Sequence, residues 1–399
     1  MQGKVENIIP GLFRTEYGKI LATLCSRFSQ VEFEVLEDML SDTFLKAMQV
    51  WPHKGVPENP RAWLYTVSKN AVLTYLRSRK ATDIPQYLAE DVQETDFIKA
   101  EMNDSQLKMI FAVCSTDIGD KAKIALALNV LCGFSPQEIA AALVTERDTV
   151  YKTLQRSKAA LKDSLVLSEY TCTAKNIDVV LHILYLLFNE GYCTTVSDAG
   201  VKHELCFEAM QLLYFLLQYD GNKNNKSNGL MALMCYQVSR IDARLKDDRQ
   251  LLYYKQDVSL WNGELIKKGD YYLQKCIDNT CTDRYTIEAA IAYWHAHPEV
   301  DSGKWDYVLK LYNLLTPVNQ SPVVVLNYVY AYSKVYDNKS ALKLLYASEV
   351  IKDNYYHTLA GVLLKEDNPQ EAIKCFQAAL VTAQNKQVIE GYINEILFD

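Results

Sequence analysis

The stretch EVLEDMLSDTFLKAMQVW, residues 34–51, decides the fold class of this chain. Its apolar residues recur at intervals of three and four, as Leu40, Phe44 and Met48 do, and this is the period of an amphipathic helix. Residues 178–192 show the same period, whereas alternating strand patterns bounded by turns are scarce. We therefore predict an all-α protein.

The composition limits the class of protein. The chain has 399 residues and a formal net charge of -7, and 49% of its residues are hydrophobic. This length exceeds what one core usually supports, so we expect two or three domains. No run approaches the length of a transmembrane span, and the first residues turn polar too soon for a signal peptide. We therefore expect a cytoplasmic protein that does not bind a membrane.

The ten cysteines are scattered along the chain, and no CxxC pair is present. Most of them sit in apolar helical surroundings, so we expect reduced thiols in the core. Cys276 and Cys281 are close neighbours, but no histidine stands beside them at the spacing of a metal ligand. We therefore predict no metal site and no cofactor.

Cations are concentrated in two segments of this acidic chain. The first is NPRAWLYTVSKNAVLTYLRSRK, residues 59–80, which holds five lysines and arginines, no carboxylate and three interleaved aromatic residues. Single-stranded nucleic acid is held by stacking on aromatic rings and by a cationic track, so this composition favours such a partner. The alternative is that Trp63 and Tyr65 are core residues and that the cations form a solvated face. On a helix over residues 62–80, one polar arc holds Thr66, Asn70, Thr74 and Arg77.

The second cationic segment, residues 132–162, has the signals of two short helices. Ser135, Pro136 and Glu138 stand in the order of an N-cap, a first-turn proline and a capping-box acceptor. A second helix start follows at Thr145, and the helix after it is cationic. This layout is typical of a helix-turn-helix, whose second helix enters the major groove while its cations neutralise phosphates. The alternative is an ordinary helical hairpin with a solvated basic face.

The composition also divides the chain into segments. Residues 1–80 form a first helical block, and residues 81–104 are rich in carboxylates and poor in large apolar residues, which is typical of a mobile linker. Residues 105–167 contain the second cationic segment. Residues 175–399 are rich in tyrosine and leucine, and the cationic clustering disappears there. We therefore predict two small nucleic-acid-binding domains, an acidic linker between them, and a helical domain of a different kind.

The order of these segments resembles that of the sigma-70 family of RNA polymerase initiation factors, in its small extracytoplasmic-function (ECF) group. LFRTEYGKILATLCSRF and EDMLSDTFLKAMQVWP look like the helices of region 2 that bind core polymerase. Residues 59–80 look like the segment that melts and reads the -10 promoter element, and residues 132–162 look like the region 4 helix-turn-helix that reads the -35 element. The resemblance implies a transcription initiation factor whose partners are core RNA polymerase and promoter DNA.

The resemblance also assigns roles to single residues. Many relatives have Gln-Glu before Thr-Phe, where this chain has Ser41 and Asp42, so the carboxylate is kept one methylene shorter. The implied contacts with core polymerase are Asp38, Asp42 and Phe44. The implied contacts with the -10 element are Trp63, Lys69, Asn70, Thr74, Arg77 and Lys80. The implied contacts with the -35 element are Thr145, Arg147, Thr149, Lys152 and Arg156.

The carboxyl-terminal half resembles the extension of one subgroup of these factors, of the type called DUF6596, which has a tetratricopeptide-like fold. The resemblance implies a regulatory domain, and stacked helix pairs usually present a concave surface to a protein or peptide. Five polar or amphipathic residues interrupt the apolar segments of this extension and are candidate surface anchors without an assigned role: Asn189, Glu190, Tyr192, Asp257 and Trp261. A weak repeat supports the fold independently: Leu359, Ala360, Leu363, Ala372, Phe376 and Ala379 follow the pattern of Tyr328, Val329, Tyr332, Ala341 and Leu345.

Two classes of function remain open from the residues themselves. A promoter-specificity factor without catalytic chemistry explains both cationic segments. A free-standing helix-turn-helix regulator, binding duplex DNA as a dimer, explains the second segment but not the aromatic-lined first one. An enzyme is not expected, because the chain has no glycine-rich phosphate loop, no GxSxG and no HExxH, and its six histidines lack obvious nucleophile or metal partners.

Overall fold

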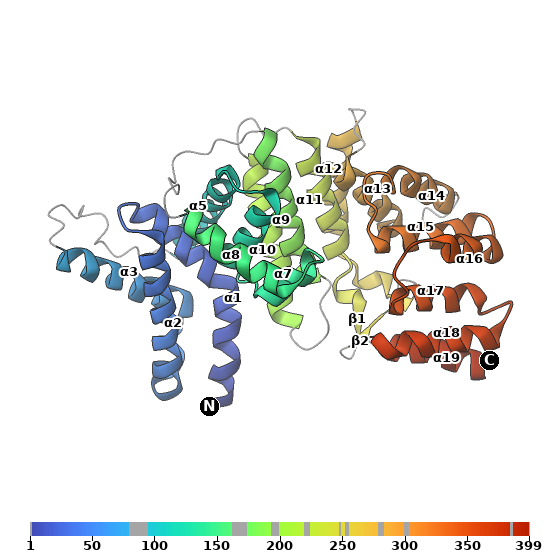
Figure 1. The fold of residues 1–399 in the computed structure, drawn as a ribbon, viewed down its shortest axis with the longest axis horizontal. Coiled ribbons are helices and arrows are strands. Elements are labelled where there is room, and N and C mark those ends of the chain that lie inside the picture. Colours follow the sequence, from blue (N-terminus) through green and yellow to red (C-terminus); the bar gives the residue numbers. More distant parts are fainter. Residues whose placement is uncertain are drawn as a thin grey trace. The chain divides into compact units, whose positions relative to one another are not determined.

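The structure is a computed structural model that describes residues 2–79, 95–161, 174–192, 199–218, 224–246, 249–251, 255–277, 283–298, 303–383 and 386–398. The regular secondary structure of these residues is helical apart from one antiparallel pair of two-residue strands, β1 (Leu245–Lys246) and β2 (Arg249–Gln250). The prediction of an all-α protein is confirmed (Figure 1). The chain forms two compact units, the first of residues 1–191 and 200–222 and the second of residues 192–199 and 223–399.

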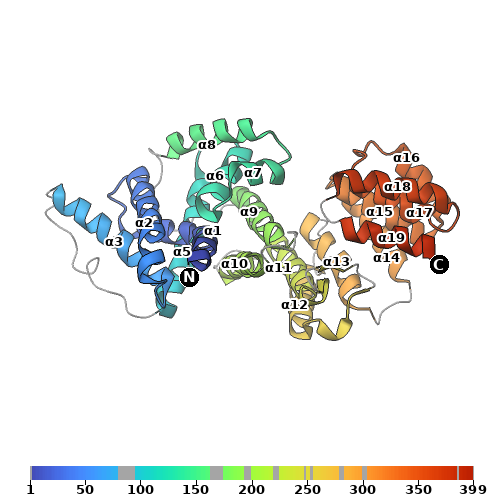
Figure 2. The ribbon, with the colours of Figure 1, turned by 90° about the horizontal axis from the view of Figure 1, so that it is seen from below.

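The first unit begins with a bundle of three helices, α1 (Gln2–Arg27), α2 (Phe33–Lys54) and α3 (Pro60–Ser78). Two neighbouring residues determine where α3 begins. The Asn59 side chain accepts a hydrogen bond from the Ala62 backbone N–H, and Pro60 occupies the first turn. Helix α2 packs against both α1 and α3 (Figure 2). The largest fully buried side chains of this bundle are Trp51, Phe28, Ile20, Leu21, Leu24, Leu36, Leu40 and Leu64.

Four more helices follow, α5 (Thr95–Ser115), α6 (Asp120–Cys132), α7 (Pro136–Ala142) and α8 (Arg147–Leu161). The capping box predicted at the start of α7 is present, with Ser135 and Glu138 bonded to each other's backbone N–H groups. The predicted linker, residues 81–104, needs a correction at its end. Helix α5 already begins at Thr95 and buries Met102 and Asn103, so residues 95–104 belong to a packed helix; residues 80–94 lie outside the described part of the chain.

Two further helices, α9 (Ala174–Tyr192) and α10 (Ala199–Gln218), belong almost entirely to the first unit. We predicted that the carboxyl-terminal domain begins at residue 175, so the structural boundary differs from the predicted one. The reason is packing: Glu208 of α10 is buried against α1 and α5, and Glu190 of α9 pairs with Arg14 of α1.

The second unit is a succession of helices that pack on their neighbours in the chain. It begins with α11 (Asn225–Val238), the short 3-10 helices η2 (Asp242–Arg244) and η4 (Val258–Leu260), and α12 (Gly263–Ile277). It continues with α13 (Arg284–Ala296), α14 (Lys304–Leu315), α15 (Pro322–Val335), α16 (Asn338–Ala347), α17 (Asn354–Leu364), α18 (Pro369–Thr382) and α19 (Lys386–Phe398). Several of these helices begin at an Asx N-cap, a local signal that each segment carries in its own sequence: Asp283, Asp337, Asp353 and Asn368.

The repeat residues of the sequence occupy the interfaces between these helices. Phe376 of α18 is fully buried and stacks on Tyr392 of α19. A methyl group built on Gly361 of α17 would lie 2.6 Å from the Phe376 ring, so this glycine allows α17 and α18 to approach closely. Most of the predicted repeat positions are buried: Val329, Ala341, Leu345, Ala360, Leu363, Ala372, Phe376 and Ala379. The other three are partly buried and pack against the cluster that contains Val329, Ala341, Leu345, Ala360 and Leu363: Tyr328, Tyr332 and Leu359.

The described cysteines are free thiols, and all except the half-buried Cys375 are buried. Burial raises the pKa of Cys25 and of Cys114 to about 12 in each case, which keeps both thiols protonated at neutral pH. Within the described ranges, no helix combines the length and the apolar character needed to cross a membrane.

Candidate nucleic-acid interface

The outer face of α3 presents a polar strip. Thr66, Asn70, Thr74 and Arg77 are all exposed, at spacings of three and four residues, so the structure brings them onto one face as the sequence predicted. The Thr74 hydroxyl donates to the Asn70 backbone carbonyl at 2.8 Å, which fixes it against its own helix. The Asn70 amide therefore stands in solvent beside a positioned neighbour, where it can bond a base edge.

An open groove of about 610 Å³ runs beside this strip, between α2 and α3. Asn70, Thr74 and Tyr75 line it from α3, and Asp42 and Lys46 line it from α2. Asp42 and Asn70 were assigned to different partners, polymerase and DNA, yet they share one groove. A polar, aromatic-edged groove of this kind can accept an unstacked base.

Two predicted contact residues are core residues instead. Phe44 is only 4% exposed, and its ring packs against Phe13 at 5.2 Å and Tyr17 at 5.8 Å between centroids. Lys69 is 2% exposed, because it lies on the face of α3 that packs into the bundle. Both side chains are buried in the bundle, whereas the predicted roles of Phe44 in polymerase binding and of Lys69 in -10 binding need exposed side chains.

Two further residues, Trp63 and Lys80, were also predicted to contact the -10 element. The Trp63 ring is half-buried and meets the Trp51 ring edge to face, with 5.3 Å between centroids. It therefore contributes to the core and keeps part of its surface for a ligand. Lys80 lies outside the described residues.

Helix α2 presents a mixed acidic and apolar face that sequence analysis missed in part. The predicted contacts Asp38 and Asp42 are exposed, and so are Leu45 and Met48, each by more than half. The four-residue spacing of Leu40, Phe44 and Met48 suggested a buried Met48, but the buried stripe continues through Ala47 and Trp51 instead. Exposed apolar side chains beside carboxylates suit a protein partner.

The predicted -35 residues are all exposed on or beside α8: Thr145, Arg147, Thr149, Lys152 and Arg156. Val150, Leu154 and Ser157 are buried on the opposite face. Helix α8 packs with that face on α6 and α7, so its cationic face remains open. This is the arrangement that a major-groove helix needs.

The turn between α7 and α8 lacks a glycine but contains a residue in the left-handed conformation. Val144 has φ 50° and is 92% exposed. For a β-branched residue this conformation costs about 1–2 kcal/mol, and an exposed side chain recovers little of that by packing.

We expect Val144→Gly to stabilise the helix-turn-helix by about 1 kcal/mol, because glycine adopts positive φ without strain. Amide hydrogen exchange of α7 and α8 in the full-length protein should slow by roughly fivefold. Val144→Ala is the matched control, since alanine keeps a Cβ and hence the strain. Equal protection in the two variants would show that side-chain size, and not backbone conformation, determines stability at this turn.

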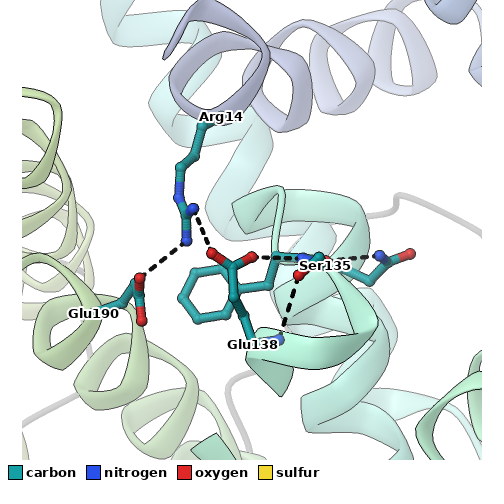
Figure 3. A network of polar contacts seen from close by, with 6 residues as sticks. Arg14, Ser135, Glu138 and Glu190 are labelled. Atoms are coloured by element: carbon teal, nitrogen blue, oxygen red, sulfur yellow. Dashed lines mark hydrogen bonds and ion pairs between the residues drawn. The ribbon is translucent and has the colours of Figure 1, made fainter. Parts of the chain in front are cut away.

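Charged contacts connect helices α1 and α2 of the first bundle with the helix-turn-helix. Arg14 of α1 donates to Glu138 of α7 at 2.7 Å and to Glu190 of α9 at 3.3 Å (Figure 3). Burial raises the pKa of the Glu138 carboxyl, but the hydrogen bonds from Ser135 and Arg14 outweigh burial and hold that pKa below its ordinary value. Lys158 of α8 donates to Glu37 of α2 at 2.5 Å.

The polar residues noted inside the carboxyl-terminal strings mostly have partners within the chain. Glu190 binds Arg14, and the Arg244 guanidinium lies 4.0 Å from the centroid of the Tyr192 ring. The Asp257 carboxylate accepts from the Ser259 backbone N–H at the start of η4. Trp261 receives the Arg240 guanidinium over its ring, at 5.6 Å. These four side chains therefore have structural roles. In the described part of the chain, no group of three or more His, Cys, Asp or Glu residues could hold a metal ion.

Comparison with known proteins finds a family match for the first bundle. Residues 13–82, which cover most of α1 and all of α2 and α3, match the family described as Sigma-70 region 2. The first bundle is thus similar to a sigma-70 region 2, and we call it region 2 below. This match supports a sigma-70 family factor with a role in transcription initiation, and region 2 implies binding to core RNA polymerase and promoter DNA.

Further matches describe the rest of the chain. Residues 176–277 match a family of unknown function, DUF6596, and this match begins in α9 and ends in α12. A protein of Rhizobium meliloti (strain 1021), itself described as uncharacterized, is 29% identical over 368 residues, which span 88% of this chain and 87% of the relative. No solved structure matches the chain significantly. Two separate parts of the chain therefore match known families, residues 13–82 and residues 176–277.

Proposed function

We propose that this protein is a transcription initiation factor of the extracytoplasmic-function group, which acts in the cytoplasm without catalytic chemistry of its own. It binds core RNA polymerase and directs it to specific promoters. The observation that carries the proposal is the region 2 match, together with the exposed Asn70 strip beside the groove between α2 and α3. Asn70 and Thr74 take an unstacked base of the -10 element, and Arg77 follows the phosphates.

The second DNA contact in this proposal is made by α7 and α8, acting as region 4. Arg147 and Thr149 in the first turn of α8 meet base edges of the -35 element, and Lys152 and Arg156 neutralise phosphates beside the groove. The open cationic face of α8 supports this assignment. Asp38, Asp42, Leu45 and Met48 on α2 form the proposed contact with core polymerase.

The helices of the second unit are proposed to form a tetratricopeptide-like array that regulates the factor. Consecutive helix pairs with buried small residues at their crossings, such as Gly361 against Phe376, support this interpretation. Its proposed ligand is a protein or a peptide.

Run-off transcription with core RNA polymerase tests the proposal, using genomic fragments that include the region upstream of this gene. Discrete transcripts that depend on the protein are expected. Asn70→Ala should reduce them about 5- to 150-fold, the loss expected for a base contact worth 1–3 kcal/mol. Gln30→Ala removes an exposed amide in the turn between α1 and α2 and should leave transcription unchanged. Equal transcript levels with the two variants would remove Asn70 from the -10 contact.

A free-standing helix-turn-helix regulator is the second candidate, and the open cationic face of α8 is the observation that favours it. Such a regulator reads duplex DNA without polymerase and has no use for the α3 strip. Promoter binding measured with and without core polymerase separates the two candidates, because only an initiation factor needs the polymerase for tight binding.

A further inference from the structure

We propose that the first unit is described in a closed state, in which α9 and α10 hold region 2 against the helix-turn-helix, and that promoter binding requires this state to open. The inference rests on the proposed function, and it assigns a role to the beginning of the DUF6596 match. It is carried by a buried ionic cluster, by a close helix crossing and by the distance between the two promoter elements.

Glu208 of α10 is the centre of the buried cluster. It is 6% exposed, and Lys19 of α1 lies 2.9 Å from its carboxylate. The Gln106 side-chain amide of α5 donates to the same carboxylate at 2.9 Å and to the Leu131 carbonyl of α6 at 3.0 Å. Burying a charged carboxylate costs free energy unless its ion-pair and hydrogen-bond partners are in place. The Glu208 cluster therefore holds α1, α5, α6 and α10 together.

The backbone next to this cluster is also closely packed. Gly18 precedes Lys19, and a methyl group built on it would lie 2.7 Å from the Leu131 Cα atom and 2.5 Å from its carbonyl carbon. Only a glycine lets α1 of region 2 approach α6, which carries the helix-turn-helix, so closely. The crossing of α1 and α6 is therefore part of the same packed core as Glu208.

Three part-buried ion pairs hold the edges of this arrangement. Arg14 connects region 2 to Glu138 of the helix-turn-helix and to Glu190 of α9 at the same time. Lys158 connects α8 to Glu37, which is next to the exposed Asp38 on the proposed polymerase-binding helix. The helix-turn-helix thus packs beside the surface that core polymerase would need.

The promoter geometry is not compatible with this packing. The -10 and -35 elements are named for positions about 25 base pairs apart, which is roughly 85 Å of B-DNA. Asn70 shares a groove with Asp42, which lies about 8 Å along α2 from Glu37. Arg147 lies about 16 Å along α8 from Lys158. With the ion pair between Glu37 and Lys158 formed, the two DNA-binding ends cannot reach both elements together.

The consequence is a defined role for α9 and α10. A ligand that binds α9 or α10 changes the population of the closed state only to the extent that its affinities for the closed and the open state differ. Coupling of ordinary size, 1–3 kcal/mol, corresponds to about a 5- to 150-fold change in the fraction of open protein.

Cross-linking in the full-length protein tests the closed state. Glu37→Cys and Lys158→Cys are combined and joined by a reducible bis-maleimide, with the parent chain and its native cysteines as background control. The linked protein should direct at least about tenfold less run-off transcript than the same sample after reduction. Equal transcription before and after reduction would overturn the inference. If a cross-link forms but neither sample nor the parent ever initiates with core polymerase, the proposed function fails instead.

A second variant tests the buried cluster without polymerase. Glu208→Gln, introduced into the double-cysteine protein, should lower the yield of cross-link about 5- to 150-fold, because it removes the charge that Lys19 pairs with. Glu204→Gln is the matched control, since Glu204 is exposed one turn earlier on α10. An unchanged cross-link yield in Glu208→Gln would show that α10 does not hold the closed state.

Discussion

Trp51→Ala is expected to lower the free energy of unfolding of region 2 by about 3–5 kcal/mol, the usual cost of removing a buried tryptophan. Trp51 is 1% exposed at the end of α2 and meets Trp63 of α3 edge to face. Its loss leaves a cavity between the two helices that line the proposed base groove. Amide exchange of α2 and α3 should accelerate by roughly 10²- to 10⁴-fold in the full-length protein.

The matched control for this prediction is Leu45→Ala, on the same helix and exposed by more than half. The free energy of unfolding obtained from its amide exchange should change by no more than about 0.5 kcal/mol. Peptides from α11 to α19 provide an internal reference, since they belong to the other compact unit. Acceleration of the same size in both variants would mean that Trp51 is not a core residue of region 2.

Features encoded by neighbouring residues could be predicted from the sequence. The Ser135 and Glu138 capping box, the helix start at Asn59 and the exposed arc of Asn70 and Thr74 each depend on a few residues in one helix turn. The helical fold class follows from the same kind of local signal, because each segment's own residues show the three- and four-residue apolar spacing of a helix.

Features that depend on distant partners could not be predicted. Phe44 and Lys69 were assigned to partners because they match contact positions of the sigma-70 family, yet both are buried. The apolar period of a helix shows which residues share a face, but it does not show which of those side chains the bundle will bury. Glu190 stood out as a polar residue in an apolar string, but its partner Arg14 is 176 residues away. The grouping of α9 and α10 with region 2 depends on such pairs, so the predicted domain boundary missed it.

Gly18→Ala has the other large expected effect, and it changes no charge. In an isolated helix alanine is favoured over glycine by about 1 kcal/mol, so α1 itself should gain stability. In the closed state the new methyl group meets the Leu131 backbone, which cannot move aside as a flexible side chain can. Overpacking against backbone should cost about 3 kcal/mol, at the upper end of the usual range. The net expectation is that the crossing of α1 and α6 separates while the three-helix bundle remains folded.

The yield of cross-link between cysteines at positions 37 and 158 measures this separation directly. Because α1 is helical in both states, its gain in helix propensity cancels between them. The overpacking cost of about 3 kcal/mol then corresponds to roughly a 150-fold change in the closed-to-open ratio, so the yield should fall sharply while amide protection of α2 and α3 persists. Gly391→Ala is the matched control, because Gly391 is also inside a helix and a methyl group there meets nothing within 4 Å. Loss of protection in α2 and α3 together with the cross-link would mean that region 2 folds only in the closed state, and an unchanged yield would mean that the α1 and α6 crossing does not hold it closed.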